Sequence, residues 1–471
     1  MTSRHDSSVL RWLVAAAFVV ILNETIMMNA IPRLMVDLGI NESSAQWLST
    51  AFMLTMAVVI PITGWFLSRV TTRQAFTIAM TTFCVGTLLA AVSWSFGILV
   101  VARVVQASAT AVMMPLLMTT LMRVVSPDDR GRVMGMVSLA MSVAPALGPA
   151  VSGIVLQFLS WRWIFLVVLP IAVAIAMVGS RRLGNVGETQ STPIDWLSAV
   201  LSAVGFGALV YGLSQMSHVT PGVVVMVVVG VLGVAAFVCR QLVLQRVDRP
   251  LLDLRTLRTR VFTVSLAAMA IAFGAMIGSM LLLQLYLQHA RHMTPLSTGL
   301  LVMPGGLAMG LLGPMIGRIY DRLGARVLML PGGAMAVLAL AAFAMMDGST
   351  PYWMVLVAHV TFSLGLAALF TPMFTMSLGS LNAHLYSHGS SLLGATQQVA
   401  GALGTALVVV VLTSQAAASA AQGAGETAAY LTGLHWAFGL CAAAGVAMVG
   451  LVAMLPARVE VEQHDVVSAH V

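Results

Sequence analysis

The chain has 471 residues, and its 23 basic and 16 acidic residues make up only 8% of the sequence. Soluble globular proteins carry about 25% charged residues. With 59% apolar residues and a mean hydropathy of +0.97, the chain cannot be a soluble enzyme or a disordered protein. A transmembrane barrel is also excluded, because its strands alternate and form no long apolar runs. The composition therefore predicts an all-α membrane protein that crosses the bilayer many times.

Fourteen apolar runs follow one another along the chain, and each is long enough to cross a bilayer as a helix of about 20 residues. In chain order they cover residues 12–33, 46–67, 75–95, 98–121, 134–158, 163–180, 196–216, 221–239, 262–287, 298–317, 326–346, 352–377, 389–413 and 431–455. Because this number is even, both termini are expected on the same side of the membrane.

The arginine residues indicate which side that is. All 23 basic residues are arginine, and 19 of them fall on the side of the two termini. Three fall on the other side, Arg33, Arg162 and Arg291, and Arg103 lies inside a span. This excess follows the positive-inside rule and predicts that both termini are cytoplasmic. The sequence pI near 10 then reflects basic loops beside an anionic leaflet rather than a nucleic-acid partner.

A sequence repeat divides the chain into two halves. Residues 61–73 read PITGWFLSRVTTR, and residues 314–326 read PMIGRIYDRLGAR. Each copy ends a span on the same side, so the repeat is parallel. We predict three regions: a six-helix half at 1–185, two additional helices with a linker at 186–245, and a second six-helix half at 246–471. Two such halves around a site at mid-membrane are typical of secondary transporters.

Six stretches follow patterns known from one family of membrane proteins. In the first span, LNETIMMNAIP (22–32) resembles Asp-x-Thr-x-x-Asn-x-Ala-x-Pro, with Glu24 in place of Asp. In the fifth span, LGPAVSG (147–153) is close to Gly-Pro-x-x-x-Gly. The others are RVVQASATA (103–111), SWRWIF (160–165), PLLDLRTLRTRVF (250–262) and YLQHARHMTPLSTGLLVMP (286–304). Together they resemble the major facilitator superfamily, specifically its fourteen-helix drug:proton antiporter branch. The resemblance implies the major facilitator fold, with two six-helix halves plus two extra central helices, and transport by alternating access.

The repeated segment resembles the loop motif of this superfamily, Gly-x-x-x-Asp-Arg-x-Gly-Arg-Arg. The family implies that this loop latches the outward-facing state by charge pairing. The second copy keeps Gly317, Asp321, Arg322, Gly324 and Arg326. The first copy keeps Gly64, Arg69 and Arg73, but it has Ser68 in place of the aspartate. We therefore expect a weaker latch in the N-terminal half.

Only one acidic residue, Glu24, and one basic residue, Arg103, lie within the expected spans. Ionisable groups inside a membrane are costly and mark candidate functional sites. At 1.5 Å per residue, Glu24 lies about 18 Å and Arg103 about 22 Å from the inner side of a ~30 Å core. We expect the two to be neighbours that carry proton coupling. The alternative is a static network, in which Glu24 pairs with adjacent polar side chains of its helix and Arg103 with the backbone.

Other residues are candidates for the transport pathway. Polar and methionine side chains could line a substrate cavity: Asn23, Met27, Asn29, Gln106, Thr110, Met114, Gln284, Gln288 and Gln397. In the fifth span, the resemblance implies a hinge or seal at Pro145, Gly148, Pro149 and Gly153, and close helix packing is a compatible explanation. His359 lies in an expected span, where we favour a packing role over a proton role.

The chain has no P-loop and no zinc-type cluster of His and Cys, so we expect no ATP-driven transport, no metal and no cofactor. The proton gradient is the expected source of energy. We predict a proton-coupled exporter of amphipathic or cationic drugs and dyes in a bacterial cytoplasmic membrane, acting as a monomer. The alternatives are an exporter of an endogenous metabolite, lipid or peptide, and, more remotely, a sensor or channel.

Overall fold

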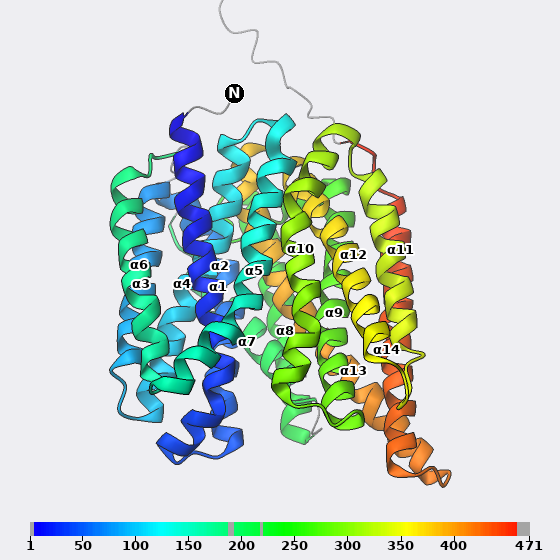
Figure 1. Cartoon of the computed structure of the whole chain (residues 1–471). Coiled ribbons are helices and arrows are strands. Elements are labelled where there is room, and N and C mark those ends of the chain that lie inside the picture. The colour runs from blue at the N-terminus through cyan, green and yellow to red at the C-terminus, as the bar shows by residue number, and fades with distance from the viewer. Residues whose placement is uncertain (1–3, 187–192, 217–219, 459–471) are drawn as a thin grey trace, which may run out of the picture.

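The computed structural model describes residues 4–186, 193–216 and 220–458 (Figure 1). Within these ranges the chain forms fourteen α-helices of 18 to 36 residues. They are α1 (Arg4–Leu38), α2 (Glu42–Arg69), α3 (Thr72–Ala91), α4 (Phe96–Val124), α5 (Arg130–Phe158), α6 (Arg162–Arg182), α7 (Trp196–Ser214), α8 (Pro221–Leu244), α9 (Arg260–Leu285), α10 (Pro295–Leu323), α11 (Arg326–Phe343), α12 (Tyr352–Gly379), α13 (Tyr386–Ala421) and α14 (Glu426–Ala453).

The helices run up and down in one bundle. We call the end at which α1 begins the N-side, and the opposite end the far side (Figure 1). Thirteen helices, judged over the described residues, are long and apolar enough to cross a membrane. The other, α5, packs between α1 and α10 in the same bundle. The fourteen expected spans therefore agree with the fourteen helices, and the expected all-α fold is confirmed.

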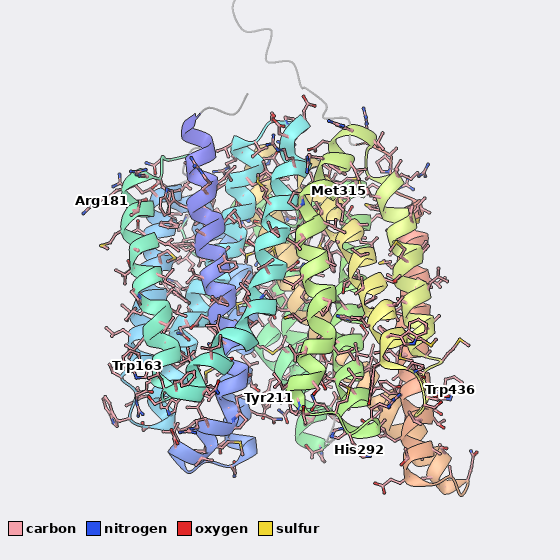
Figure 2. All side chains as sticks on the ribbon, viewed as in Figure 1. Trp163, Arg181, Tyr211, His292, Met315 and Trp436 are labelled. Atoms are coloured by element: carbon pink, nitrogen blue, oxygen red, sulfur yellow. The ribbon has the colours of Figure 1, made fainter. Side chains whose placement is uncertain are left out.

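Polar residues at the helix ends explain where several helices begin. The side chains of Asn41 and Thr71 accept hydrogen bonds from backbone N–H groups in the first turns of α2 and α3, and Ser95 does the same for α4. Such caps satisfy donors that have no partner inside the helix. At the far side, the large exposed side chains of Trp163 and Trp436 (Figure 2) are typical of anchors at a membrane interface.

Helices α1–α6 pack together as one group, the N-half, and α9–α14 form a second group, the C-half. The two halves meet along α5–α10 and along α2–α13. The extra helices α7 and α8 form a hairpin, and α7 packs against both α2 and α13. The hairpin therefore covers one of the two seams between the halves.

The seam between α5 and α10 depends on glycine. A Cβ atom added to Gly135 would lie only 2.2 Å from the carbonyl oxygen of Gly313. A Cβ atom added to Gly317 would lie 1.9 Å from the carbonyl oxygen of Gly131. The two helix backbones therefore touch, which small residues at a helix interface permit.

Candidate functional site

The arginine inside the bundle is enclosed by its neighbours. Arg103, in α4, is only 2% exposed. Its Nε donates to the carbonyl oxygen of Leu48 at 3.4 Å, and its Nη1 donates to Oε1 of Gln106 at 3.1 Å. The guanidinium lies 4.2 Å from the centre of the Phe52 ring. Gln106 in turn donates through Nε2 to Oγ1 of Thr87 at 3.0 Å. These bonds fix the guanidinium within the N-half.

The acidic residue inside the bundle lies near this arginine. Glu24 is near the middle of α1, is partly buried, and interacts electrostatically with Arg103. Among the described residues, no salt bridge of 4.0 Å or less joins the two groups. The structure thus places the two groups within electrostatic range of each other, and Arg103 is bonded to Leu48 and Gln106.

A buried amide next to Glu24 is unsatisfied. Asn23 is 0% exposed, and neither its Oδ1 nor its Nδ2 has a hydrogen-bond partner among the described residues. A buried polar group without a partner costs free energy. This part of α1 therefore combines a carboxylate close to an arginine with an amide that is free to accept a new partner.

The glycine of the fifth-span motif supports this part of α1. A Cβ atom on Gly148 would lie 2.3 Å from Oγ1 of Thr25, so only glycine lets α5 approach α1 one residue beyond Glu24. Around Gly153, by contrast, no atom lies within 4 Å of an added Cβ. Pro145 is exposed, and the side chain of Pro149 lies outside the described residues.

The expected cavity residues do not share one environment. Four are buried in the packing of the N-half: Asn23, Met27, Gln106 and Thr110. Met114, Gln288 and Gln397 are partly buried, Gln284 is exposed, and the side chain of Asn29 lies outside the described residues. The amide of Gln106 is used by Arg103 and Thr87. In this conformation Gln106 therefore positions the arginine.

The second copy of the loop motif joins the two halves. Oδ1 of Asp321, in α10, accepts from the backbone N–H of Gly131 at 2.7 Å. Its Oδ2 accepts from the backbone N–H of Arg132, also at 2.7 Å. Both donors belong to the first turn of α5. The Asp321 carboxylate therefore connects the C-half to the N-half at the N-side.

The first copy of the motif does not make this connection through Ser68. The Ser68 hydroxyl donates to the carbonyl oxygen of Trp65 within α2, at 2.8 Å. Gly64 instead faces α13, where an added Cβ would lie 2.9 Å from Nδ1 of His388.

The arginines of both copies remain at the N-side. Arg69 lies over the Trp65 ring at 5.6 Å, the Arg73 N–H donates to Asn185, the Arg322 carbonyl accepts from Arg458, and Arg326 donates to the Ala453 carbonyl.

Other hydrogen bonds also close the N-side. Oγ1 of Thr119 and Oγ of Ser390 are 2.9 Å apart, and Oγ of Ser138 and Oγ1 of Thr371 are 3.0 Å apart. Nη2 of Arg130 donates to the Tyr386 hydroxyl at 3.4 Å. These bonds all join the N-half to the C-half in the N-side half of the bundle, so the two halves are closed against each other there.

His359 is bonded inside its own half. Its Nε2 lies 3.1 Å from the carbonyl oxygen of Val302. A Cβ atom on Gly305 would lie 2.5 Å from the imidazole ring. The histidine therefore occupies a close-packed position between α12 and α10, as a packing residue would.

The segment between α8 and α9 is a feature for which the sequence suggested no role. Its residues 251–254 are buried, although the segment is rich in arginine, and Asp253 is only 3% exposed. Burial alone would raise the pKa of Asp253, but hydrogen bonds from the side chain and backbone of Arg255 hold it below its ordinary value. The Asp253 N–H donates to Nδ1 of His388. The signal in the sequence was the apolar run Leu251–Leu252 directly before an aspartate.

A second ion pair holds the extra hairpin. Arg240 of α8 donates to both oxygens of Asp195, at the start of α7, and each distance is 2.7 Å. The hydrogen bond from Arg240 is the main cause that lowers the pKa of Asp195 below its ordinary value. The hairpin is therefore tied at the same N-side level as the buried segment.

Comparison with known proteins agrees with this architecture. The family model described as Major Facilitator Superfamily matches residues 13–405. An uncharacterized MFS-type transporter of Bacillus subtilis, YcnB, is 36% identical over 93% of this chain and 92% of its own length. The lincomycin resistance protein LmrB of Listeria monocytogenes is 34% identical over 87% of this chain and 88% of its own length.

The fold is similar to that of a solved transporter. The structure of the human organic anion transporter MFSD10 superposes with a TM-score of 0.65, at 14% identity, over 95% of this chain and 99% of that chain. The similar bacterial proteins include drug-resistance transporters, in agreement with the branch that the motifs indicated. The chain is thus a multi-pass membrane protein and a transporter rather than an enzyme, and it belongs to the major facilitator superfamily.

Proposed function

We propose that the protein exports amphipathic or cationic small molecules in exchange for protons. The observation that supports this most directly is Glu24, the only acidic residue in the interior of the described spans, lying within electrostatic reach of Arg103. A carboxylate at mid-membrane can hold either a proton or the positive charge of a substrate. Competition between the two for one group couples their movement in opposite directions.

The orientation is part of the proposal. The arginines lie mainly on the N-side, where Figure 2 shows Arg181, so we assign this side to the cytoplasm. The closed N-side then corresponds to a conformation that is accessible from outside. In that state Glu24 takes up a proton, and it releases the proton inside after the halves have rocked.

Arg103 keeps its position in the N-half during exchange, so its positive charge acts on Glu24 from a fixed point. Its bonds to Leu48 and Gln106 lie within the N-half, so rocking of the halves does not need to break them. Glu24 lies on a different helix, and Gly148 of α5 packs directly against Thr25, the next residue of that helix. A shift of α1 against α5 therefore changes the distance between the carboxylate and the guanidinium, and with it the affinity for a proton.

Two observations support the proposed substrate class: the single carboxylate inside the spans, Glu24, and the names of similar bacterial proteins. A single carboxylate balances one positive charge, which favours monovalent cations. A similar protein carries lincomycin resistance in its name, which favours export of drugs. A panel of lincomycin, dye cations, lipids and short peptides, scored by collapse of a pH gradient, separates drug export from export of an endogenous compound.

The central test is flux in proteoliposomes with an imposed pH gradient, using ethidium as the probe. We expect the wild type to accumulate ethidium and to dissipate the gradient. Glu24→Gln should lose gradient-driven accumulation, because the amide cannot carry the proton. Retention of accumulation by Glu24→Gln would contradict proton coupling by this residue.

A glycine pair provides a matched control for the local structure. Gly148→Ala places a Cβ against Thr25 and should reduce gradient-driven flux by displacing α1. Gly153→Ala has open space around the added atom and should transport like the wild type. Equal activity of the two variants would show that the position of α1 against α5 does not matter for exchange.

A further inference from the structure

The segment that enters α9 is buried where four helices meet. Leu251 and Leu252 are each 1% exposed and belong to one apolar cluster with Ile60 of α2, Phe237 of α8 and Ala395 of α13. Phe206 and Val210 bring α7 into the same cluster. The segment is thus wedged into the N-side of the α2–α13 seam, together with the hairpin.

The hairpin holds one side of this wedge. Oε1 of Gln241, in α8, accepts from the backbone N–H groups of Leu251 at 2.8 Å and Leu252 at 3.2 Å. Nε2 of the same side chain donates to Oγ of Ser198 in α7 at 2.8 Å. Gln241 is fully buried, so these bonds are shielded from water. One glutamine therefore ties the segment to both helices of the hairpin.

His388 of α13 holds the other side. The backbone N–H of Asp253 donates to its Nδ1 at 3.3 Å, which requires that this nitrogen carries no proton. The same Nδ1 faces Gly64 of α2, at 2.9 Å from an added Cβ. The segment, α2 and α13 therefore meet at a single imidazole.

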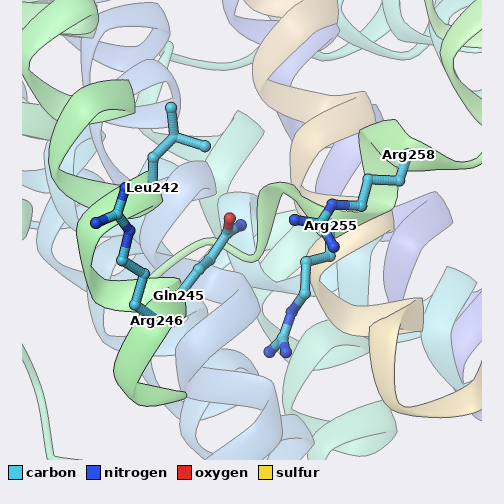
Figure 3. A pocket seen from close by; sticks show the side chains of 5 residues that line it. All are labelled: Leu242, Gln245, Arg246, Arg255 and Arg258. Carbon is cyan, nitrogen blue, oxygen red and sulfur yellow. The ribbon is translucent and has the colours of Figure 1, made fainter.

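The charge on Asp253 is balanced locally. Its Oδ2 accepts from Nη2 of Arg255 at 2.8 Å, and its Oδ1 accepts from Nε2 of Gln245 at 3.0 Å. Arg255 also pairs with Asp248 at 2.8 Å. Arg255 lines a cavity of about 400 Å³ together with Leu242, Gln245, Arg246 and Arg258. Figure 3 shows these five side chains. Arg255 therefore lines this cavity and also pairs with Asp253, and this pairing fixes the carboxylate at the edge of the buried segment.

We propose that residues 250–258 form a latch that holds the N-side closed at the α2–α13 seam, with His388 and Asp253 as its positioning residues. The latch supplies a connection that the first copy of the repeat does not make, because the Ser68 hydroxyl bonds within α2. Opening of the N-side separates α2 from α13 at Gly64 and His388, and this removes the packing that holds the segment. The latch acts on the conformational step of transport, whatever the substrate and whether or not protons are coupled.

The test measures the N-side directly in the purified full-length protein, without substrate or gradient. Spin labels at Ile78→Cys in α3 and Val327→Cys in α11 report the distance between the halves, in a background in which the three native cysteines are replaced by serine. Both positions are exposed. His388→Leu removes the acceptor, whereas His388→Asn places a side-chain oxygen where Nδ1 was.

We expect His388→Leu to raise the ratio of open to closed N-side about 2- to 10-fold, the effect of one lost hydrogen bond. His388→Asn should restore the wild-type distance distribution, which a purely structural role for the imidazole would not predict. Asp253→Asn should shift the ratio in the same direction by less, because it keeps the N–H donor to His388 and weakens only bonds to Arg255 and Gln245, which do not cross the seam. This variant also provides the test if His388→Leu does not fold.

The latch is refuted if His388→Leu and Asp253→Asn both keep the wild-type distances. It is also refuted if His388→Asn opens the N-side as far as His388→Leu. Loss of proton coupling by Glu24→Gln leaves these distances unaffected, so failure of the latch and failure of the proposed export function give different results.

Discussion

Two seams close the N-side, and they are fastened differently although their sequences are related. At α5–α10, the Asp321 carboxylate bridges the halves by accepting from the N–H groups of Gly131 and Arg132. At α2–α13, Ser68 takes the equivalent place in the repeat but bonds within its own helix. There, His388 of α13 accepts a hydrogen bond from the backbone N–H of Asp253, in the segment after α8. A repeat in sequence therefore does not guarantee a repeat in how the structure is held.

The difference follows from charge at a helix start. The first N–H groups of an α-helix lack partners inside the helix, and its N-terminus carries partial positive charge. The Asp321 carboxylate meets both needs at the start of α5. The residue before α13, Leu385, supplies no side-chain hydrogen bond to that helix. A neutral hydroxyl at position 68 supplies no charge, so closure at α13 depends on packing, on the buried segment and on the hydrogen bonds of Ser390 and Tyr386 to the N-half.

The largest effect on stability is expected when a larger side chain replaces glycine at the α5–α10 seam. Gly317→Ala places a Cβ 1.9 Å from the Gly131 carbonyl oxygen, and a backbone atom cannot move aside. We expect a loss of about 3 kcal/mol in the free energy of unfolding, at the upper end of overpacking costs. Gly64→Ala meets the His388 side chain at 2.9 Å and should cost about 1 kcal/mol. Thermal unfolding in detergent measures both, and the opposite order would show that the α2–α13 seam is the more tightly packed.

The next effect concerns the charge at the same seam. Asp321→Asn keeps the size of the side chain but places an NH2 group against one of two N–H donors. We expect the ratio of open to closed N-side to rise about tenfold, because hydrogen bonds to charged groups contribute about 1.5–3 kcal/mol. The Ile78–Val327 label distance measures this ratio. Asp347→Asn at the far side is the control, because among the described residues that carboxylate bonds only to nearby Ser349 and Thr350. An unchanged distance in Asp321→Asn would mean that glycine packing alone closes the seam.

A smaller effect on exchange and on the label distance is expected when an aspartate replaces Ser68 in the first copy of the repeat. Ser68→Asp gives the first copy the carboxylate of the second, near the start of α13. We expect a few-fold slower exchange in proteoliposomes and a narrower label distance, because both seams would then carry a charged cap, worth about 1 kcal/mol. In a His388→Leu background the same substitution should recover part of the closed state. Faster exchange in Ser68→Asp would contradict the inference that the α2–α13 seam lacks the charged cap that Asp321 supplies at the α5–α10 seam.

The sequence predicted the fold and part of the site, and the reasons are physical. Long apolar runs determine spans, and a depth of 1.5 Å per residue placed Glu24 and Arg103 as neighbours. The resemblance of the repeat to the loop motif of the superfamily pointed to Asp321 as a latch residue. Gln106, in contrast, was expected in a cavity and lies 0% exposed beside Arg103. In a helix that is apolar almost all round, the spacing of residues does not distinguish an inner face from a cavity face.

The buried segment was recognised from sequence only as a likeness to a family. Its arginines indicated a solvated loop, but its backbone is held by Gln241 and His388, which lie 10 and 135 positions away from their partners along the chain. Contacts between such distant residues come from the tertiary structure, and no local pattern contains them. The role of this segment therefore became visible only with the hairpin and α13 in place.

The smallest effect is expected from pH, and it tests whether the α2–α13 seam titrates. The groups that face Asp253 are Arg255 and His388, with Asp248 beyond Arg255. Because the pKa of Asp253 is held below its ordinary value of 3.8, the stabilisation from its charge is fully present above that pH. It is lost only as the pH falls below 3.8 toward the lowered pKa.

In an Asp321→Asn background, which removes the titratable carboxylate of the other seam, the label distance should therefore stay constant between about pH 8 and pH 5, and further opening of the N-side should begin only below about pH 4. Asp253→Asn should remove this acid-induced opening, because the amide does not titrate. An acid-induced opening that persists in Asp253→Asn would instead assign the transition to an imidazole. His388 would then be the group to examine, since protonation of Nδ1 removes the acceptor on which the latch depends. In that case the two seams would differ in their response to pH as well as in their fastening.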